Sequence, residues 1–135
     1  MQNLTSVLEG CLKNNKEALC VAVVDLQSGL LIGVAHSVPY FTETFLDAVA
    51  AAAVDMFRGK TVSAVEKMLT SLRGTLVRDM IKEAQITTDG TYHFMATSPL
   101  KPSALVVLIT TRRAEMTAGW TAVRTLLPAI APLCP

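Results

Sequence analysis

The chain has 135 residues, of which 51% are hydrophobic and 17% are charged, and its mean hydropathy is +0.43. This length predicts one domain, 1–135, and this composition excludes an intrinsically disordered chain. The net charge of +1 comes without a basic run longer than Arg112-Arg113, which argues against nucleic acid and an anionic membrane surface as partners.

The N-terminal part of the chain predicts a helix followed by two strands. Residues 4–15 carry apolar side chains at helical spacing, and Ser6 and Glu9 have the spacing of a capping box. Residues 19–35 contain two apolar, β-branched runs separated by a turn sequence. We therefore expect a hairpin of two well-buried strands, with a bulge at Gly33.

Two helices are expected in the middle of the chain. The first runs from Thr42, whose hydroxyl can cap the first turn, to Phe57, and Gly59 ends it. The second covers about 61–72 and ends near Gly74. Its expected apolar face comprises Val62, Val65, Met68, Leu69 and Leu72, and its expected solvent face comprises Glu66, Lys67 and Arg73.

The last third of the chain predicts three strands and a helix, at 80–87, 91–96, 104–109 and 116–131. Asp89-Gly90 is a typical hairpin turn, and 98–102 is expected to be a loop. The fold class is therefore α+β, with a five-stranded antiparallel sheet and helices on its faces. The order is α-β-β-α-β-β-β-α, with an extra helical piece near 61–72.

Residues that could carry catalysis are few and scattered. His36 and His93 are the only histidines, and neither accompanies a nucleophile in a recognisable motif. Gly59-Lys60-Thr61 matches the end of a phosphate-binding loop, but Val54 stands where that loop needs its first glycine. No cluster of Cys, His, Asp and Glu has metal-ligand spacing. We therefore expect a non-enzyme without a cofactor or a metal.

The sequence also indicates a compartment. No basic segment precedes an apolar core at the N-terminus, so no signal peptide is expected. The longest apolar runs, 48–54 and 104–109, are shorter than the roughly 20 residues of a bilayer span, so no membrane insertion is expected. The odd number of cysteines without CxxC spacing indicates reduced, mostly buried thiols at Cys11, Cys20 and Cys134. The expected location is the cytoplasm.

The apolar excess predicts an interface on the long helix. Its small residues extend the apolar band beyond the face that a sheet can cover, and they are Ala48, Ala50, Ala51 and Val54. Because small side chains let two helices approach closely, a twofold dimer through this face is the simplest outcome. The alternative is that the segment 61–72 folds back and covers the same face within one chain.

The strand at 80–87 is a second candidate interface. Its polar positions suit an edge strand that can pair with its copy, and they are Lys82, Gln85 and Thr87. The sequence therefore predicts two surfaces for self-association or for a partner.

Four segments of the chain share the order and character of one family's motifs. They are Leu8-Glu9-Gly10-Cys11-Leu12, the strand-turn-strand 22–30, the hairpin 86–92, and the strand 104–109 followed by Ala114-Glu115-Met116. Together they resemble the roadblock/dynein light chain family, within the roadblock–longin group, over about 4–131. Two departures are that Gly119 matches the family's helix-start glycine only with a small shift, and that 39–79 is longer than the family's usual single helix.

The resemblance implies a five-stranded antiparallel sheet between helices. It also implies homodimers, or heterodimers with a paralogous subunit, whose sheets join edge to edge while the long helices pack side by side. Family members regulate or scaffold small Ras-like GTPases, or serve in motor and signalling complexes, usually without catalysis. Carried onto this sequence, the dimer or partner contacts would come from Thr44, Asp47, Ala48, Ala51 and Asp55 and from the strand Lys82 to Thr87, which includes Gln85.

Two functional hypotheses follow from the sequence. The leading one is a non-catalytic dimeric adaptor or regulator of a small Ras-like GTPase or of a signalling complex. The alternative is a profilin- or longin-like sensory module that holds a small ligand between sheet and helix. A buried cavity lined by polar groups such as Tyr40, His93 or Thr97 would favour this alternative.

Overall fold

A computed structural model describes residues 3–135 of the chain. In chain order, its elements are α1 (Leu4–Asn14), β1 (Ala18–Asp25), β2 (Leu31–His36), α2 (Glu43–Arg58), α3 (Lys60–Arg73), β3 (Glu83–Thr87), β4 (Thr91–Ser98), β5 (Lys101–Thr111) and α4 (Met116–Ile130), followed by a short 3-10 turn, Ala131–Leu133. The five strands form one antiparallel sheet in the order β2-β1-β5-β4-β3. The predicted fold class and element order are confirmed, including the extra helical piece, which is α3.

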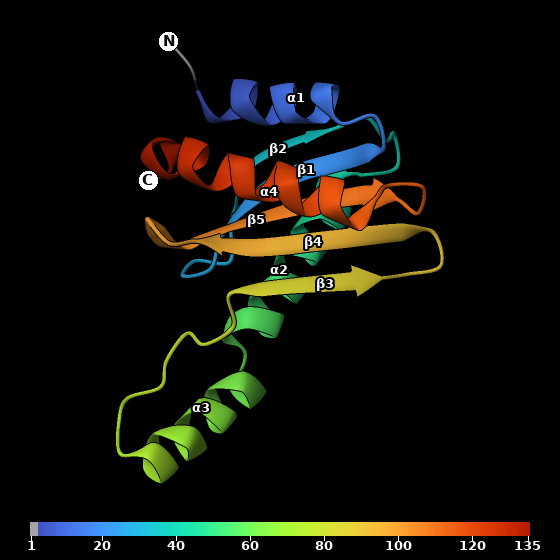
Figure 1. Cartoon of the computed structure of the whole chain (residues 1–135). Helices are drawn as coiled ribbons and strands as arrows, with labels where there is room; N and C mark the ends of the chain where they lie inside the picture. Colours follow the sequence, from blue (N-terminus) through green and yellow to red (C-terminus); the bar gives the residue numbers. More distant parts are fainter. Residues whose placement is uncertain (1–2) are drawn as a thin grey trace.

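The sheet lies between two helical layers, and α3 stands apart from both (Figure 1). Helices α1 and α4 cover one face of the sheet, and α2 covers the other. Strands β2 and β3 are the two edges. Helix α3 lies beyond the β3 edge, away from the body of the sheet.

Alternating side chains of the central strands build one core on each face of the sheet. Toward α1 and α4 the strands contribute Val21, Val23, Phe94, Ala96, Val106 and Leu108. Toward α2 they contribute Cys20, Ala22, Val24, Met95, Leu105, Val107 and Ile109. Burial on both faces explains why β1 and β5 have nearly continuous apolar sequences.

Several local predictions are confirmed. The Thr42 hydroxyl accepts a hydrogen bond from the Phe45 amide at 3.2 Å and so caps α2. The pairing of β1 with β2 shifts register where Val23 faces Gly33 and the next residue of β1 faces Leu31, which places a bulge beside this glycine. Helix α4 continues through Pro128 to Ile130.

Three local predictions are wrong. The N-cap of α1 is Asn3, which accepts the Ser6 amide at 2.8 Å, so the capping box joins Asn3 and Ser6 rather than Ser6 and Glu9. The expected loop 98–102 is a tight turn at 99–100, because β4 and β5 extend up to it. Strand β2 is half-buried rather than well buried, because it is an edge strand.

Helix α4 approaches the sheet most closely at Gly119, which is buried. A Cβ atom built at this position would lie 2.5 Å from Cε2 and 2.8 Å from Cε1 of Phe94. Phe94 is fully buried, and its ring meets the ring of Trp120 edge-on at a centroid distance of 5.4 Å. Glycine is therefore needed where the helix backbone rests on this ring.

A single extended residue, Gly59, separates α2 from α3. Its φ and ψ are −68° and 171°, and its amide donates to the Asp55 carbonyl at 3.0 Å. A Cβ atom here would lie 3.1 Å from the carbonyl carbon of Asp55 and closer still to the oxygen. The glycine therefore allows the chain to leave the axis of α2 at once, and α3 starts in a new direction.

Helix α3 is oriented only partly as the sequence predicts, since Lys67 and Arg73 are exposed as expected. Glu66, which was expected to face solvent, is buried, whereas Val65, Met68 and Leu72 from the expected apolar face are exposed. Neither hydrophobic core includes a residue of α3. Helix α3 also leaves Ala48 and the neighbouring outer residues of α2 exposed. The alternative that this segment covers the small face of α2 is therefore wrong.

Candidate partner interface

Helix α2 presents an exposed stripe that contains the predicted contact residues of this helix. We define this outer stripe of α2 as Thr44, Asp47, Ala48, Ala51 and Asp55, which recur at intervals of one to four residues and are all exposed. The opposite side of the helix is buried against the sheet through Leu46, Ala50, Ala53 and Phe57. Ala50 was expected on the outer face, and its place in the core is a correction.

The β3 edge carries the other predicted contact residues. Gln85 and Thr87 are exposed on β3, and the Gln85 side-chain amide donates to the Thr87 hydroxyl at 3.0 Å. Lys82 lies just before the strand, since β3 starts at Glu83 rather than at residue 80. Its carbonyl accepts the Thr97 amide at 2.9 Å, which holds this residue beside β4.

Two of the predicted contact residues at the β3 edge, Gln85 and Thr87, lie on the face of the sheet opposite to the outer stripe of α2. Gln85 pairs with Phe94 and Thr87 pairs with Tyr92, so their side chains point to the α1 and α4 face. The outer stripe of α2 lies beyond the other face. A partner that touched both sets would have to pass around the β3 edge, whose outer backbone groups are free to pair with another strand.

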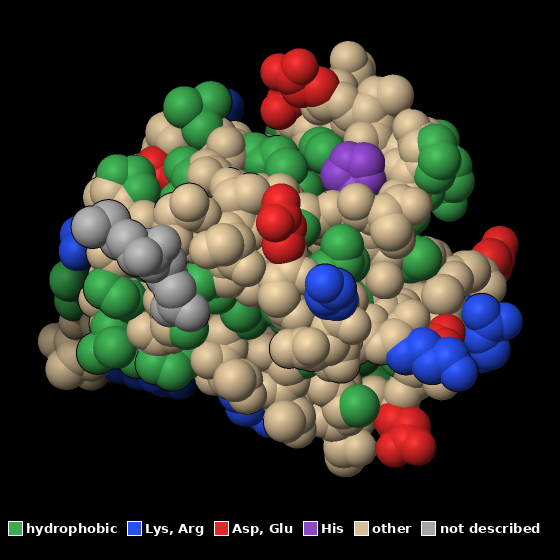
Figure 2. Space-filling model, turned by 90° about the horizontal axis from the view of Figure 1, so that it is seen from above, with side chains coloured by type: hydrophobic (Ala, Val, Ile, Leu, Met, Phe, Trp, Pro, Cys, Tyr) green, Lys and Arg blue, Asp and Glu red, His purple; other side chains and the backbone are tan. Residues whose placement is uncertain are grey.

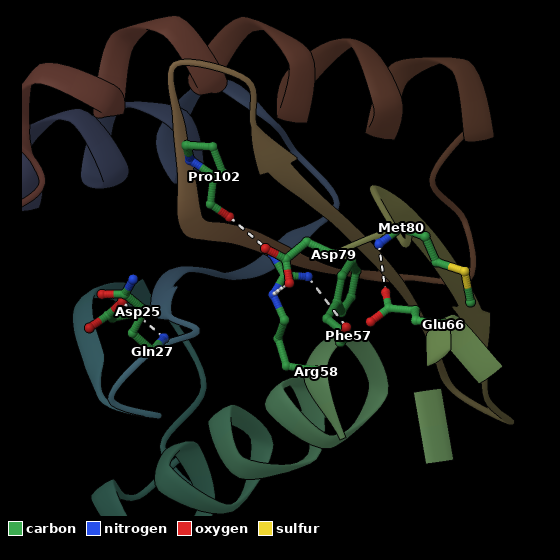
Figure 3. Close-up of polar contacts among 8 residues, drawn as sticks. All are labelled: Asp25, Gln27, Phe57, Arg58, Glu66, Asp79, Met80 and Pro102. Atoms are coloured by element: carbon green, nitrogen blue, oxygen red, sulfur yellow. Dashed lines mark hydrogen bonds and ion pairs between the residues drawn. The ribbon is translucent and has the colours of Figure 1, made fainter. Parts of the chain in front are cut away.

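Polar contacts fix the connection between α3 and β3 (Figure 3). Arg58 Nε forms an ion pair with Asp79 Oδ1 at 3.1 Å, and Arg58 Nη2 donates to the Pro102 carbonyl at 3.2 Å. The Met80 amide donates to Glu66 Oε2 at 2.8 Å. These contacts were missed by sequence reasoning, because their partners lie 14 to 44 residues apart and no local pattern marks them.

A shallow groove of about 680 Å³ runs between α1 and α4. Small and polar side chains dominate its lining, and Cys11 lies in it with a pKa that burial raises. Burial also raises the pKa of the Cys20 thiol, to about 12. Tyr40, His93 and Thr97, which were considered for a ligand cavity, do not line this groove.

The two histidines occupy separate strands with separate partners. His36 Nδ1 accepts the Val38 amide at 3.3 Å, and His93 Nε2 lies 2.9 Å from the Thr91 hydroxyl. Strands β1 and β5 lie between β2 and β4, so the two rings do not meet in one site. Across residues 3–135, the structure contains no group of three or more His, Cys, Asp or Glu residues that could hold a metal ion.

The helices in the described part of the chain are all too short or too polar to cross a membrane. Charged side chains are scattered on the face seen in Figure 2, where Lys and Arg stand near Asp and Glu instead of gathering into one broad patch.

The half-buried ring of His93 makes folding stability depend on pH. Burial lowers the pKa of His93 in the folded chain, below the usual histidine pKa of about 6.5. At a pH below about 6.5 the unfolded chain therefore binds a proton at this residue more readily than the folded chain does. Stability should therefore fall as the pH drops below about 6.5. We expect the urea midpoint to fall between pH 7.5 and pH 5.5, and the fall to be smaller in His93→Gln. An equal fall in the wild type and the variant would contradict this assignment.

Comparisons with known proteins find the fold but no close relative. The sequence matches no protein-family model, and it matches no curated protein. The structure is similar to the roadblock/LC7 domain from Streptomyces avermitilis, with a TM-score of 0.69 and 16% identity over 97% of each chain. It is also similar to MglB from Myxococcus xanthus, with a TM-score of 0.65 and 15% identity over 96% of this chain and 92% of that one.

A third similar structure is the gliding protein MglB from Thermus thermophilus. The TM-score is 0.69 and the identity 17%, and the alignment covers 95% of this chain and 85% of that one. The chain therefore has the roadblock/LC7 fold, and the resemblance seen in the sequence is confirmed at the level of the fold.

Proposed function

We propose that this chain is a cytoplasmic, non-catalytic dimeric adaptor or regulator of a small Ras-like GTPase or of a signalling complex. The dimer forms with a second copy or with a paralogous subunit. The observation that carries the proposal is the roadblock/LC7 fold, which the sequence motifs and the solved structures support over nearly the whole chain. The outer stripe of α2 and the β3 edge supply the surfaces that such a dimer needs.

Regulation of a GTPase by this chain works through differential binding. The dimer shifts the GTPase toward the nucleotide state that it binds more tightly, and it shifts that equilibrium by no more than the difference between the two affinities. The two histidines make separate contacts, and the described residues hold no group of three or more His, Cys, Asp or Glu, which supports a mode of action by shape and contact.

Nucleotide-dependent capture tests the proposed partner. The purified chain is immobilised and offered small Ras-like GTPases from the same genome, loaded with GDP or with a non-hydrolysable GTP analogue. We expect one nucleotide state to bind at least about tenfold more tightly, which corresponds to about 1.4 kcal/mol. A GTPase that binds equally in both states would leave a scaffold role, and the absence of any binding GTPase would contradict the proposal.

The substitution Ala51→Arg tests the outer stripe of α2 as a dimer contact. Ala51 is exposed in the centre of the stripe, so arginine should leave the fold intact but place a large charged group in the apolar contact. We expect the dimer dissociation constant, measured by sedimentation equilibrium, to rise at least about tenfold.

The matched control for Ala51→Arg is Ala129→Arg. Ala129 is an exposed alanine on α4, on the other side of the sheet, so arginine there should leave the dimer unchanged. A dimer that survives Ala51→Arg with its mass and affinity unchanged would show that the contact lies elsewhere.

A further inference from the structure

Two acidic side chains stand in the outer stripe of α2, one on each side of its alanines. Asp47 and Asp55 are both exposed, and their separation of eight residues places them about 12 Å apart along the helix. Ala48 and Ala51 lie between them. A partner that packs closely on these alanines therefore comes close to both carboxylates.

Neither acid has an ion-pair partner within the described part of the chain. Among residues 3–135 the ion pairs are Arg58–Asp79, Arg113–Glu17 and Arg124–Glu83. Arg58 is the single base on α2, and its guanidinium is engaged with Asp79 and with the Pro102 carbonyl. The remaining charged residue of α2 is also an acid, Glu43, so the exposed charge of this helix is entirely negative.

A twofold dimer of identical chains sets acids against acids at this stripe. Twofold symmetry makes the two α2 helices either antiparallel or parallel. In an antiparallel pair that crosses at Ala51, Asp47 of each copy comes level with Asp55 of the other, because both residues lie four positions from the crossing point. In a parallel pair each acid comes level with its own equivalent. Both arrangements set like charges together, which weakens the binding of the chain to its copy.

The small side chains of the outer stripe keep these charges close together. Two packed helices lie about 8–10 Å apart, and alanines at the contact favour the short end of this range. The Debye length at physiological ionic strength is about 8 Å. Salt therefore screens the facing carboxylates only in part, and the exclusion of water from the contact strengthens their repulsion.

We propose that the outer stripe of α2 selects, over a second copy, a partner chain of the same fold whose long helix carries lysine or arginine where this chain has Asp47 and Asp55. The inference rests on the dimer of the proposed function and decides between its two forms in favour of the heterodimer. Small side chains in the partner's helix permit close packing on Ala48 and Ala51, and its bases pair with the two acids. The same two acids repel a second copy, so they supply attraction to one partner and rejection of the other.

Two double variants of this chain test the role of the acids. Asp47→Asn with Asp55→Asn removes both negative charges, and Asp47→Lys with Asp55→Lys gives the chain the basic stripe of the proposed partner. Both positions are exposed, so both variants should keep the circular dichroism spectrum and the thermal midpoint of the wild type to within a few degrees. Sedimentation equilibrium measures the dissociation constants of the three homodimers and of a 1:1 mixture of the wild type with the lysine variant, in which one chain carries a fluorescent label.

The proposal predicts a definite order of affinities. The asparagine variant should form a homodimer at least about tenfold tighter than that of the wild type, because the repulsion is gone. The wild type and the lysine variant together should form a heterodimer at least about tenfold tighter than the homodimer of either chain. Raising the salt concentration from about 50 mM to about 500 mM should reduce both differences, since they come from charge.

The matched control for the asparagine variant is Glu9→Gln with Glu115→Gln. It changes the net charge by the same amount, at two exposed acids on α1 and at the start of α4, which cover the other face of the sheet. Its homodimer should have the affinity of the wild type. A gain in affinity equal to that of the asparagine variant would show that net charge, and not the outer stripe, sets the affinity, and would contradict the proposal.

The inference and the proposed function fail in different ways. A wild-type homodimer as tight as the asparagine homodimer and as the mixed pair overturns the selection of a basic partner and leaves the proposed dimer standing. If none of these chains associates in any combination, the dimer of the proposed function is wrong as well.

Discussion

Replacing Phe57 with alanine should destabilise the folded chain by about 3–5 kcal/mol. Phe57 is fully buried in the last turn of α2, where it closes the core between this helix and the sheet. Its loss removes a large apolar side chain from that core and leaves a cavity that the rigid sheet below it fills only partly. Chemical unfolding in urea, followed by circular dichroism, measures the change as a lower midpoint.

The control for Phe57→Ala is Phe45→Ala in the same helix. Phe45 is 39% exposed and stacks on Phe41 with 4.8 Å between ring centroids, so its loss should destabilise the chain by about 1 kcal/mol. Both substitutions change helix propensity equally, so the difference between them reports packing. If both substitutions lowered the free energy of unfolding equally, Phe57 would not be the residue that packs α2 against the sheet.

Replacing Gly119 with alanine should also destabilise the chain, by about 1–3 kcal/mol. In an open helix this substitution would be stabilising, because alanine favours the helix over glycine by about 1 kcal/mol. At Gly119 the new methyl group instead meets the ring of Phe94, which is buried and confined by Trp120. Helix α4 must move away from the sheet or the ring must leave its place.

The matched control for Gly119→Ala is Gly10→Ala in α1. No atom lies within 4 Å of the place where a Cβ would stand at Gly10, so alanine there should stabilise the chain by about 0.5–1 kcal/mol. The same change is thus expected to have opposite signs in two helices of one molecule. Stabilisation at both positions would contradict the close contact between α4 and Phe94.

The order of elements could be predicted from the sequence because each element carries a local signal. The continuous apolar run 104–109 predicts a strand buried on both faces, and β5 is buried from Ala104 to Thr110. The Asp89-Gly90 step predicts the β3–β4 hairpin that is found. These signals depend on neighbouring residues, so one sequence is sufficient to find them.

The orientation of each element could not be predicted as well, because it depends on partners distant in the chain. Ala50 and Ala51 look alike in the sequence, yet Ala50 faces the sheet and Ala51 faces solvent. The apolar spacing of 61–72 predicts a helix with Val65, Met68 and Leu72 facing inward, and the helix exists with these residues facing outward. The contacts that turn it, from Glu66 to the Met80 amide and from Arg58 to Asp79, have no local signature.

The candidate surfaces, too, could be predicted from the sequence only where a local signal marks them. The five residues predicted as contacts on α2 are all exposed, and helical spacing explains this once the buried side is recognised, while their role as contacts stays a prediction. The β3 edge was found as a strand, but its short length moved Lys82 outside it. That Gln85 and Thr87 face away from α2 follows from the register with β4, which hairpin geometry sets and composition does not reveal.

The separation of α3 from both cores has a consequence for local unfolding. A helix of 14 residues is marginal in water on its own, and α3 opens without exposing either core. Its amide hydrogens therefore exchange with solvent through openings of low free energy, well below the free energy of global unfolding that protects β1 and β5.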